Sequence, residues 1–414
     1  MREPGKQRWA IVAVLFATMF FIWGPINASS VFFLPVVKHF GWSRAFFSLL
    51  VATAPLAAGF SSPAIGTLID RYGARGIMIT GATMVALSFI ALSRANSPAA
   101  FLAIFVVLGA GVTASTIIPA AVIITRAFRE QRGLTLGIAF AGIPLGGTGI
   151  AIFANQVVKR GGFRAGYFSM ALPILFVVIP LLAIFMRSVA PGEMTESGES
   201  EAELPGLEVR DALRSRSFWM IAIAEVLFAI AGVGLRVHLV PLLTGVGYSP
   251  TLAAEILGAM FVFNAIGTFA IGPIVDRLGG RATLSLVFLI AGAGIAALLG
   301  GSHLVAVATF ILIFGLVGET PSAIFPIAVT ESLGARRLGG LLGLFALCRT
   351  FGFAAGPVIA GRIFDQSGSY AGALILFIAV EVISMIAIRA TLPISDEQVR
   401  VATAEPATGS LSAP

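Results

Sequence analysis

Twelve apolar segments, each long enough to cross a lipid bilayer, dominate the sequence. At about 1.5 Å per residue, roughly 20 helical residues span the hydrocarbon core. Of the 414 residues, 57% are hydrophobic and only 11% are charged, which is too apolar for a water-soluble fold of this length. The sequence predicts an all-α membrane protein with twelve transmembrane helices, at residues 9–38, 43–69, 76–95, 98–126, 133–158, 165–187, 217–244, 250–275, 282–301, 303–330, 338–362 and 369–390.

One long polar break, residues 188–216, divides these segments into two sets of six. It carries an acidic run and is typical of a flexible connector; the run comprises Glu193, Glu196, Glu199, Glu201 and Glu203. We therefore expect an N-terminal half at residues 1–187, a connector at 188–216, and a C-terminal half at 217–394. Residues 395–414 are polar and are expected to form a disordered cytoplasmic tail.

Basic residues are distributed unequally between the two sets of loops. Loops on the side of the amino terminus, with the tail, hold 18 Lys and Arg residues, whereas the opposite loops hold 7. This bias predicts that both termini are cytoplasmic in a cell inner membrane. The first apolar segment is too long for a signal-peptide core, so we expect it to remain as a helix. The net charge of +7 thus reflects membrane topology, and we expect no nucleic-acid partner.

An internal repeat relates the two halves with an offset of 206 residues. Gly41-Trp42-Ser43 recurs as Gly247-Tyr248-Ser249, and Pro35 recurs as Pro241. Gly133 and Gly137 recur as Gly339 and Gly343 at the same offset. Two parallel six-helix halves with a substrate site between them form the architecture of secondary transporters.

A charged loop follows the second segment and recurs after the eighth. Its residues are Asp70, Arg71, Gly73 and Arg75 in the first copy, and Asp276, Arg277, Gly279 and Arg281 in the second. With Gly66 and Gly272 before the acids, these loops resemble the signature of the major facilitator superfamily. The resemblance covers the chain to about residue 390 and implies that fold, usually as a monomer. An acid and two bases at a helix end predict a cytoplasmic latch that breaks and re-forms during transport.

A narrower resemblance is to the bacterial monocarboxylate and oxalate/formate transporter group, through Gly41-Trp42-Ser43-Arg44. That group carries a central cation on the eleventh helix, where Arg349 lies here. Its eighth helix has Asn and then Arg four residues later, but this chain has Asn264 followed by Thr268. The resemblance therefore implies Arg349, Asn264 and Thr268 as substrate-binding positions, and it disfavours a dicarboxylate such as oxalate.

Of the 27 basic residues, only Arg236 and Arg349 lie well inside predicted segments, away from the segment ends. An intramembrane cation is costly unless it is paired or hydrated, so such residues mark functional sites. Arg349 is predicted to bind a carboxylate; the alternative is a structural ion pair with Glu319. Arg236 either binds substrate or extends toward the membrane surface.

Acidic and amide side chains complete the candidate site. A carboxyl group in a poorly hydrated cavity can carry a proton, which makes Glu319 and Glu225 candidates for proton coupling; the alternative is a permanent salt bridge to one of the two arginines. Glu319 is favoured of the two because it lies deep in its segment, with Gly318 and Pro321 nearby. Glu225 and Arg236 share one helix face but lie about 16 Å apart, so each needs another partner or a water-filled path. Asn27, one turn after Trp23, contacts substrate or another helix.

These features predict proton-coupled transport of a small organic anion by alternating access. Anion exchange, and proton-driven export of hydrophobic or amphipathic compounds, remain as alternatives. A sensor that binds an anion without transport, and a membrane-embedded enzyme, are disfavoured because the loops are short and the sequence has no catalytic triad or phosphate-binding loop. The sequence has no metal-ligand set either, and we expect no cofactor.

Overall fold

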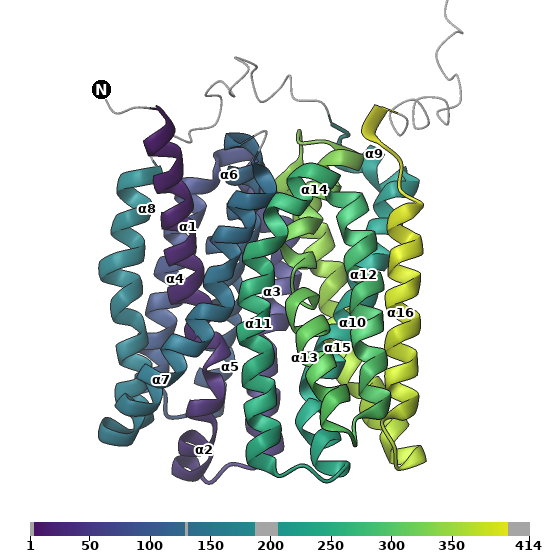
Figure 1. Cartoon of the computed structure of the whole chain (residues 1–414). Helices are drawn as coiled ribbons and strands as arrows, with labels where there is room; N and C mark the ends of the chain where they lie inside the picture. The colour runs from purple at the N-terminus through teal and green to yellow at the C-terminus, as the bar shows by residue number, and fades with distance from the viewer. Residues whose placement is uncertain (1–3, 129–130, 187–205, 396–414) are drawn as a thin grey trace, which may run out of the picture.

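The computed structural model describes residues 4–128, 131–186 and 206–395, and these are almost entirely helical (Figure 1). The first half contains α1 (Pro4–Asn27), α2 (Ser29–Phe40), α3 (Arg44–Tyr72), α4 (Ala74–Arg94), α5 (Pro98–Ser115), α6 (Ile117–Ala127), α7 (Arg132–Pro173), the π-helix η1 (Ile174–Val178) and α8 (Ile179–Phe185). The second half contains α10 (Arg216–Gly245), α11 (Pro250–Leu278), α12 (Gly280–Ala297), the 3₁₀ turn η4 (Leu298–Gly300), α13 (Leu304–Val317), α14 (Pro321–Leu333), α15 (Leu338–Ser367) and α16 (Ala371–Arg389).

Ten helical stretches in the described residues are long and apolar enough to cross a membrane, or eleven if the bent pair α13 and α14 counts as one. One of these stretches, Arg132–Phe185, has 54 residues, which corresponds to about 81 Å and cannot be a single crossing. Gly162 interrupts it with φ 75° and ψ 177°, a conformation that favours glycine, and α8 returns to the end where α1 begins (Figure 1). Counting this stretch as two crossings gives the twelve predicted helices.

Three predicted spans are interrupted within their length. The first divides at Ala28, between α1 and α2, and the fourth divides at Thr116, between α5 and α6. The tenth divides between α13 and α14 with a bend of 41°. Glu319 lies in this last break, beside Gly318 and Thr320, where the helical hydrogen-bond pattern is interrupted. The break places this carboxylate outside a regular helix, in the middle of the bundle.

The described part of the predicted connector is not simply an extended linker. The acidic run lies outside the described residues, but the short helix α9 (Val209–Arg214) forms before α10. Leu207 N donates to Leu333 O at 2.9 Å, and Glu208 pairs with Arg336 and Arg337. Residues 206–216 are therefore folded against the second half, because backbone and charge partners are available there.

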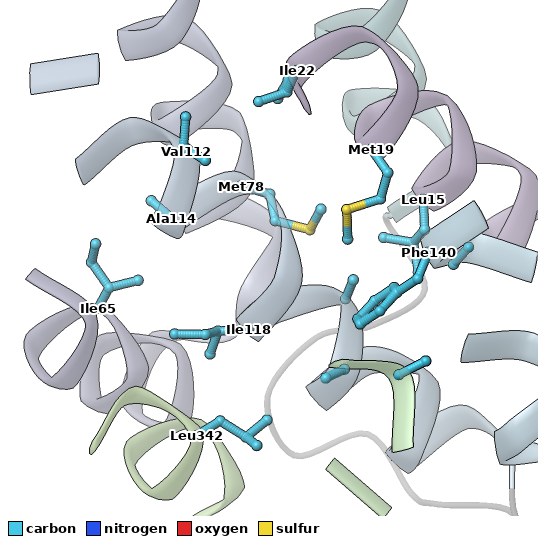
Figure 2. Packing of buried hydrophobic residues seen from close by; sticks show 14 of the residues in the cluster. Leu15, Met19, Ile22, Ile65, Met78, Val112, Ala114, Ile118, Phe140 and Leu342 are labelled. Atoms are coloured by element: carbon cyan, nitrogen blue, oxygen red, sulfur yellow. The ribbon is translucent and has the colours of Figure 1, made fainter. Parts of the chain in front are cut away.

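The two halves are held together by α3 against α15 and by α7 against α11. Figure 2 shows part of the buried cluster, in which Leu342 of α15 joins residues of the first half such as Ile65, Ile118 and Phe140. Glycines permit this close approach: a Cβ atom on Gly66 would collide with the carbonyl oxygen of Gly339. The glycine contacts of both interfaces join residues near the ends of α3 and α11 to the starts of α15 and α7. Because successive crossings alternate in direction, these contacts lie toward the end of the bundle where α1 begins and α16 ends.

Candidate functional site

A cavity of about 390 Å³, here called the central cavity, lies between the two halves. Helices of both halves line it, beyond the glycine contacts and farther from the end that carries the termini. All five predicted substrate-binding residues line this cavity, together with Glu319; they are Asn27, Arg236, Asn264, Thr268 and Arg349. The fold thus brings together residues that lie more than 300 positions apart in the sequence.

Two ion pairs supply the charge of this region. Arg236 Nη1 lies 2.6 Å from Glu319 Oε1, and the two side chains are 29% and 33% exposed. Arg349 Nη1 lies 3.5 Å from Glu225 Oε2, with only 14% and 4% exposure. The Arg349 pair is the more buried and the longer of the two: its hydrogen bond is at the limit of length, but its burial makes the loss of either charge costly.

The pairing differs from the alternative considered from the sequence, in which Arg349 binds Glu319. Glu225 occupies that position instead, because α10 packs along α15 and presents Glu225 to Arg349. Glu319 instead pairs with Arg236, which lies about three turns after Glu225 on α10. The expectation that Glu225 and Arg236 each need a separate partner is confirmed, and Arg236 points to a carboxylate in the cavity rather than to the membrane surface.

The amide and hydroxyl candidates have different surroundings. Asn27 Nδ2 donates to Ile143 O at 3.3 Å, so it does bridge two helices while remaining exposed to the cavity. Asn264 is 2% exposed, and its Nδ2 has no hydrogen-bond partner in the part of the chain that the structure describes. Thr268 is buried, and its carbonyl group lies against Gly137 of α7. Asn264 therefore offers an unused donor at the cavity wall.

Two further cavity residues escaped sequence reasoning. The Phe353 ring lies 5.7 Å from Arg349 Cζ, in cation–π range, one helical turn along α15. Thr113 lines the cavity and donates to Ala58 O at 3.1 Å. The repeat offset of 206 relates Thr113 to Glu319, so this position could have been found from the sequence.

The acids of the two repeated loops bridge the halves. Asp70 accepts hydrogen bonds from Gly339 N at 3.0 Å and Gly340 N at 2.7 Å, at the start of α15. Asp276 accepts from Gly133 N at 2.6 Å and Leu134 N at 3.0 Å, at the start of α7. Each aspartate thus caps a helix of the opposite half, where its charge also complements the helix dipole.

The bases of these loops do not form the acid–base latch in the expected way. Arg75 donates to Ala183 O at 2.9 Å, and Arg281 binds Thr391, both within their own half. Arg71 lies over the Tyr72 ring, and within the described residues neither Arg71 nor Arg277 forms an ion pair. Asp70 instead pairs with Arg126 at 3.2 Å, also within its own half. In these two loops, the hydrogen bonds between the halves are made by the acids, because the backbone N–H groups at the starts of α15 and α7 lie within reach.

A two-half helical bundle with a charged cavity between its halves has the architecture of a secondary transporter. The family model of the Major Facilitator Superfamily matches residues 10–357 and 239–413. The chain belongs to this superfamily, and it is a membrane transporter rather than an enzyme.

Similar proteins agree with this assignment. Monocarboxylate transporter 13 of Rattus norvegicus is 24% identical over 381 residues, covering 90% of this chain and 87% of the relative. The oxalate:formate antiporter of Oxalobacter formigenes is 24% identical, covering 94% and 93%. FucP, the fucose:proton symporter of E. coli, solved in the outward conformation, has a TM-score of 0.71 at 16% identity, covering 91% of this chain and 97% of FucP.

Proposed function

We propose that the protein transports a small, monocarboxylate-like organic anion by alternating access, together with a proton. The observation that carries this proposal is Arg349: a guanidinium in the middle of α15, facing a cavity, with its paired carboxylate at 3.5 Å. A guanidinium in such a poorly hydrated site binds a carboxylate through two parallel hydrogen bonds. The names of the relatives support the same substrate class.

The charges at the cavity, to which Glu225 is connected through Arg349 without lining the space itself, give a reason for proton coupling. The two arginines and two glutamates sum to zero, so a bare anion would add an unbalanced negative charge inside the membrane. A proton that enters with the anion keeps the sum at zero. In this scheme a glutamate takes up the proton, releases its arginine, and the substrate carboxylate replaces it.

Glu225 is the stronger candidate for the proton that releases Arg349. The sequence favoured Glu319 for this step, but Glu319 contacts Arg236 in the structure. Protonation of Glu225 would remove the carboxylate that competes with substrate for Arg349. Protonation of Glu319 would likewise release Arg236. Arg236 would then give the substrate a second cation, in place of the arginine that the resembled transporter group carries at the position of Thr268.

The aspartate caps provide the conformational part of the mechanism. With Asp70 and Asp276 bound to the opposite half, the end carrying the termini is closed. Opening that end requires both caps to break, and re-forming them closes it again. A cavity that is electrically neutral after anion and proton enter would lower the cost of closing the opposite end around a dry site.

Transport into proteoliposomes tests this function. Labelled lactate, pyruvate, acetate, formate and oxalate are supplied with and without an inward proton gradient. We expect gradient-driven uptake of at least one monocarboxylate, reduced more than 100-fold in Arg349→Gln, whereas Arg160→Gln at an exposed position of α7 retains it. Glu225→Gln should still bind the anion but lose the dependence on the gradient.

Three outcomes contradict the proposal in different ways. Uptake retained by Arg349→Gln would make that arginine structural. Uptake that needs a counter-anion but no gradient would indicate exchange. No uptake of any acid, with active efflux of an uncharged dye, would favour export of hydrophobic compounds.

We also propose that the termini face the cytoplasm of a bacterial inner membrane. The support is the excess of basic residues at that end, 18 against 7. Single cysteines in a Cys348→Ser background test it. A membrane-impermeant maleimide added outside intact cells should label Ser302→Cys and leave Arg336→Cys unlabelled, and the opposite pattern would reverse the orientation.

A further inference from the structure

A second cavity, of about 400 Å³, lies wholly within the first half and is called here the apolar cavity. Helices α1 to α5 and α7 line it with phenylalanine and aliphatic side chains, including Phe33, Phe47, Phe89, Phe105 and Leu108. It shares four lining residues with the central cavity: Trp23, Pro55, Ala58 and Val112. The two spaces are therefore adjacent across one wall.

The lining of the apolar cavity suits hydrocarbon. Its side-chain polar groups are the hydroxyls of Ser29, Ser48 and Tyr167 and the indole N–H of Trp23. Ser29 and Ser48 are exposed, so the remaining interior offers few partners to water. Apolar walls of this kind bind apolar groups through removal of their surface from water.

The shared wall contains an unused donor. Trp23 Nε1 is buried and has no hydrogen-bond partner among the residues described. Buried donors are nearly always paired, so this indole indicates a ligand that passes beside it. A ligand that extends from the central cavity into the apolar cavity would meet it.

Size supports the same conclusion. Cavities of roughly 300 to 1,000 Å³ hold ligands of drug size, and each of the two cavities falls in that range by itself. Formate or lactate would leave most of this space unfilled. An anion with an apolar chain or ring would fill both parts.

We infer that the substrate is an amphipathic monocarboxylate, with its carboxylate at Arg349 and an apolar chain or aromatic ring in the apolar cavity. This inference rests on the proposed function and specifies its substrate class. The two halves then have separate tasks: the second half binds the charge, and the first half selects the apolar portion.

Binding of a homologous series tests the inference. The full chain in lipid nanodiscs is titrated with acetate, butyrate, hexanoate and octanoate by calorimetry, and empty nanodiscs correct for partition into lipid. A buried methylene is worth about fourfold in affinity. We expect octanoate to bind at least tenfold more tightly than butyrate, and 1-octanol to bind at least tenfold more weakly than octanoate.

Matched variants test where the apolar chain of the ligand binds. Val51 lines only the apolar cavity, so Val51→Phe should reduce the octanoate-to-butyrate ratio to below threefold. Val106→Phe makes the same change on the exposed face of α5 and should leave the ratio unchanged. Leu108→Phe, with Leu102→Phe as its exposed control, repeats the test at a second position if Val51→Phe does not fold.

The outcomes separate this inference from the proposed function. Two outcomes overturn the inference alone. In the first, octanoate keeps its affinity advantage over butyrate in both Val51→Phe and Leu108→Phe. In the second, octanoate has no such advantage, although short carboxylates still bind in a way that depends on Arg349. Equal binding of 1-octanol and octanoate identifies a lipid-chain site and also overturns it. Carboxylates of every length that bind without dependence on Arg349 overturn the proposed function.

Discussion

The closed end of the bundle and the central cavity use the internal repeat in opposite ways. At the closed end, donors and acceptors recur at the same offset of 206: Asp70 and Asp276 as acceptors, Gly133 and Gly339 as donors. Around the cavity, the four charges of the two ion pairs all come from the second half. Met19, Ser30, Thr113 and Ile143 occupy the corresponding positions of the first half.

This difference separates movement from recognition. Equivalent caps let the two halves open and close about a common pseudo-symmetric interface, which needs the same contact on both sides. Substrate recognition needs no such symmetry, so charge can be concentrated in one half while the other remains apolar. Each prediction below tests one side of this comparison.

The largest effect is expected from Glu225→Gln. It leaves Arg349, whose side chain is only 14% exposed, without its carboxylate. An unpaired buried charge should lower the free energy of unfolding by about 3 kcal/mol. Thermal unfolding in nanodiscs should show a lower Tm, and the double variant Glu225→Gln/Arg349→Gln should recover at least half of the loss. A double variant no more stable than the single one would contradict the pairing.

The caps are expected to have intermediate effects. Asp70→Asn and Asp276→Asn each remove a charge from a helix N-terminus, worth about 1 kcal/mol, and so shift the closed-to-open ratio by roughly five- to tenfold. Asp70→Asn and Asp276→Asn should shift this ratio equally, because the additional pair of Asp70 with Arg126 lies within one half and is not broken by opening.

Spin labels on Arg71→Cys and Arg277→Cys, in a Cys348→Ser background, report this shift as a longer distance between the halves. Asp211→Asn on α9 is a suitable control, since it lies outside both caps. Clearly unequal opening of Asp70→Asn and Asp276→Asn would show that the two caps differ in a way that their hydrogen bonds to the opposite half do not explain.

Glu319→Gln is expected to affect stability less than Glu225→Gln. Its pair with Arg236 is about one-third exposed, and solvent screening limits such a pair to roughly 1 kcal/mol. The effect should appear mainly as weaker anion binding. A Tm loss equal to that of Glu225→Gln would mean that the two pairs are equally dehydrated.

The smallest effect is expected where the connector meets the second half. Glu208 raises the pKa of Arg337 through a hydrogen bond and its charge, so Arg337 stays protonated at all pH values compatible with folding. Both side chains are well exposed, and Glu208→Gln should change stability by less than about 0.5 kcal/mol. That change should be the same at about pH 6 and pH 8.5. A pH-dependent loss would indicate another titrating partner.

Much of the fold was predictable because membrane crossings are local properties of sequence. Segment length and hydropathy located the crossings, and Gly162 marks the kink between the fifth and the sixth. The position of Arg349 in a crossing also follows from the sequence. Helix breaks were less visible, because Thr116 and Glu319 interrupt segments whose composition remains apolar.

By itself, the sequence determined the number of crossings, the repeat, the two loop acids and the presence of two intramembrane arginines. Only the tertiary structure decided that Arg349 lies against Glu225, that Arg236 lies against Glu319, and that each aspartate caps the opposite half. Spacing along one helix fixes which of its residues share a face. Which face meets which neighbour depends on the rotation and axial shift of separate helices, and these are set by packing across the whole bundle.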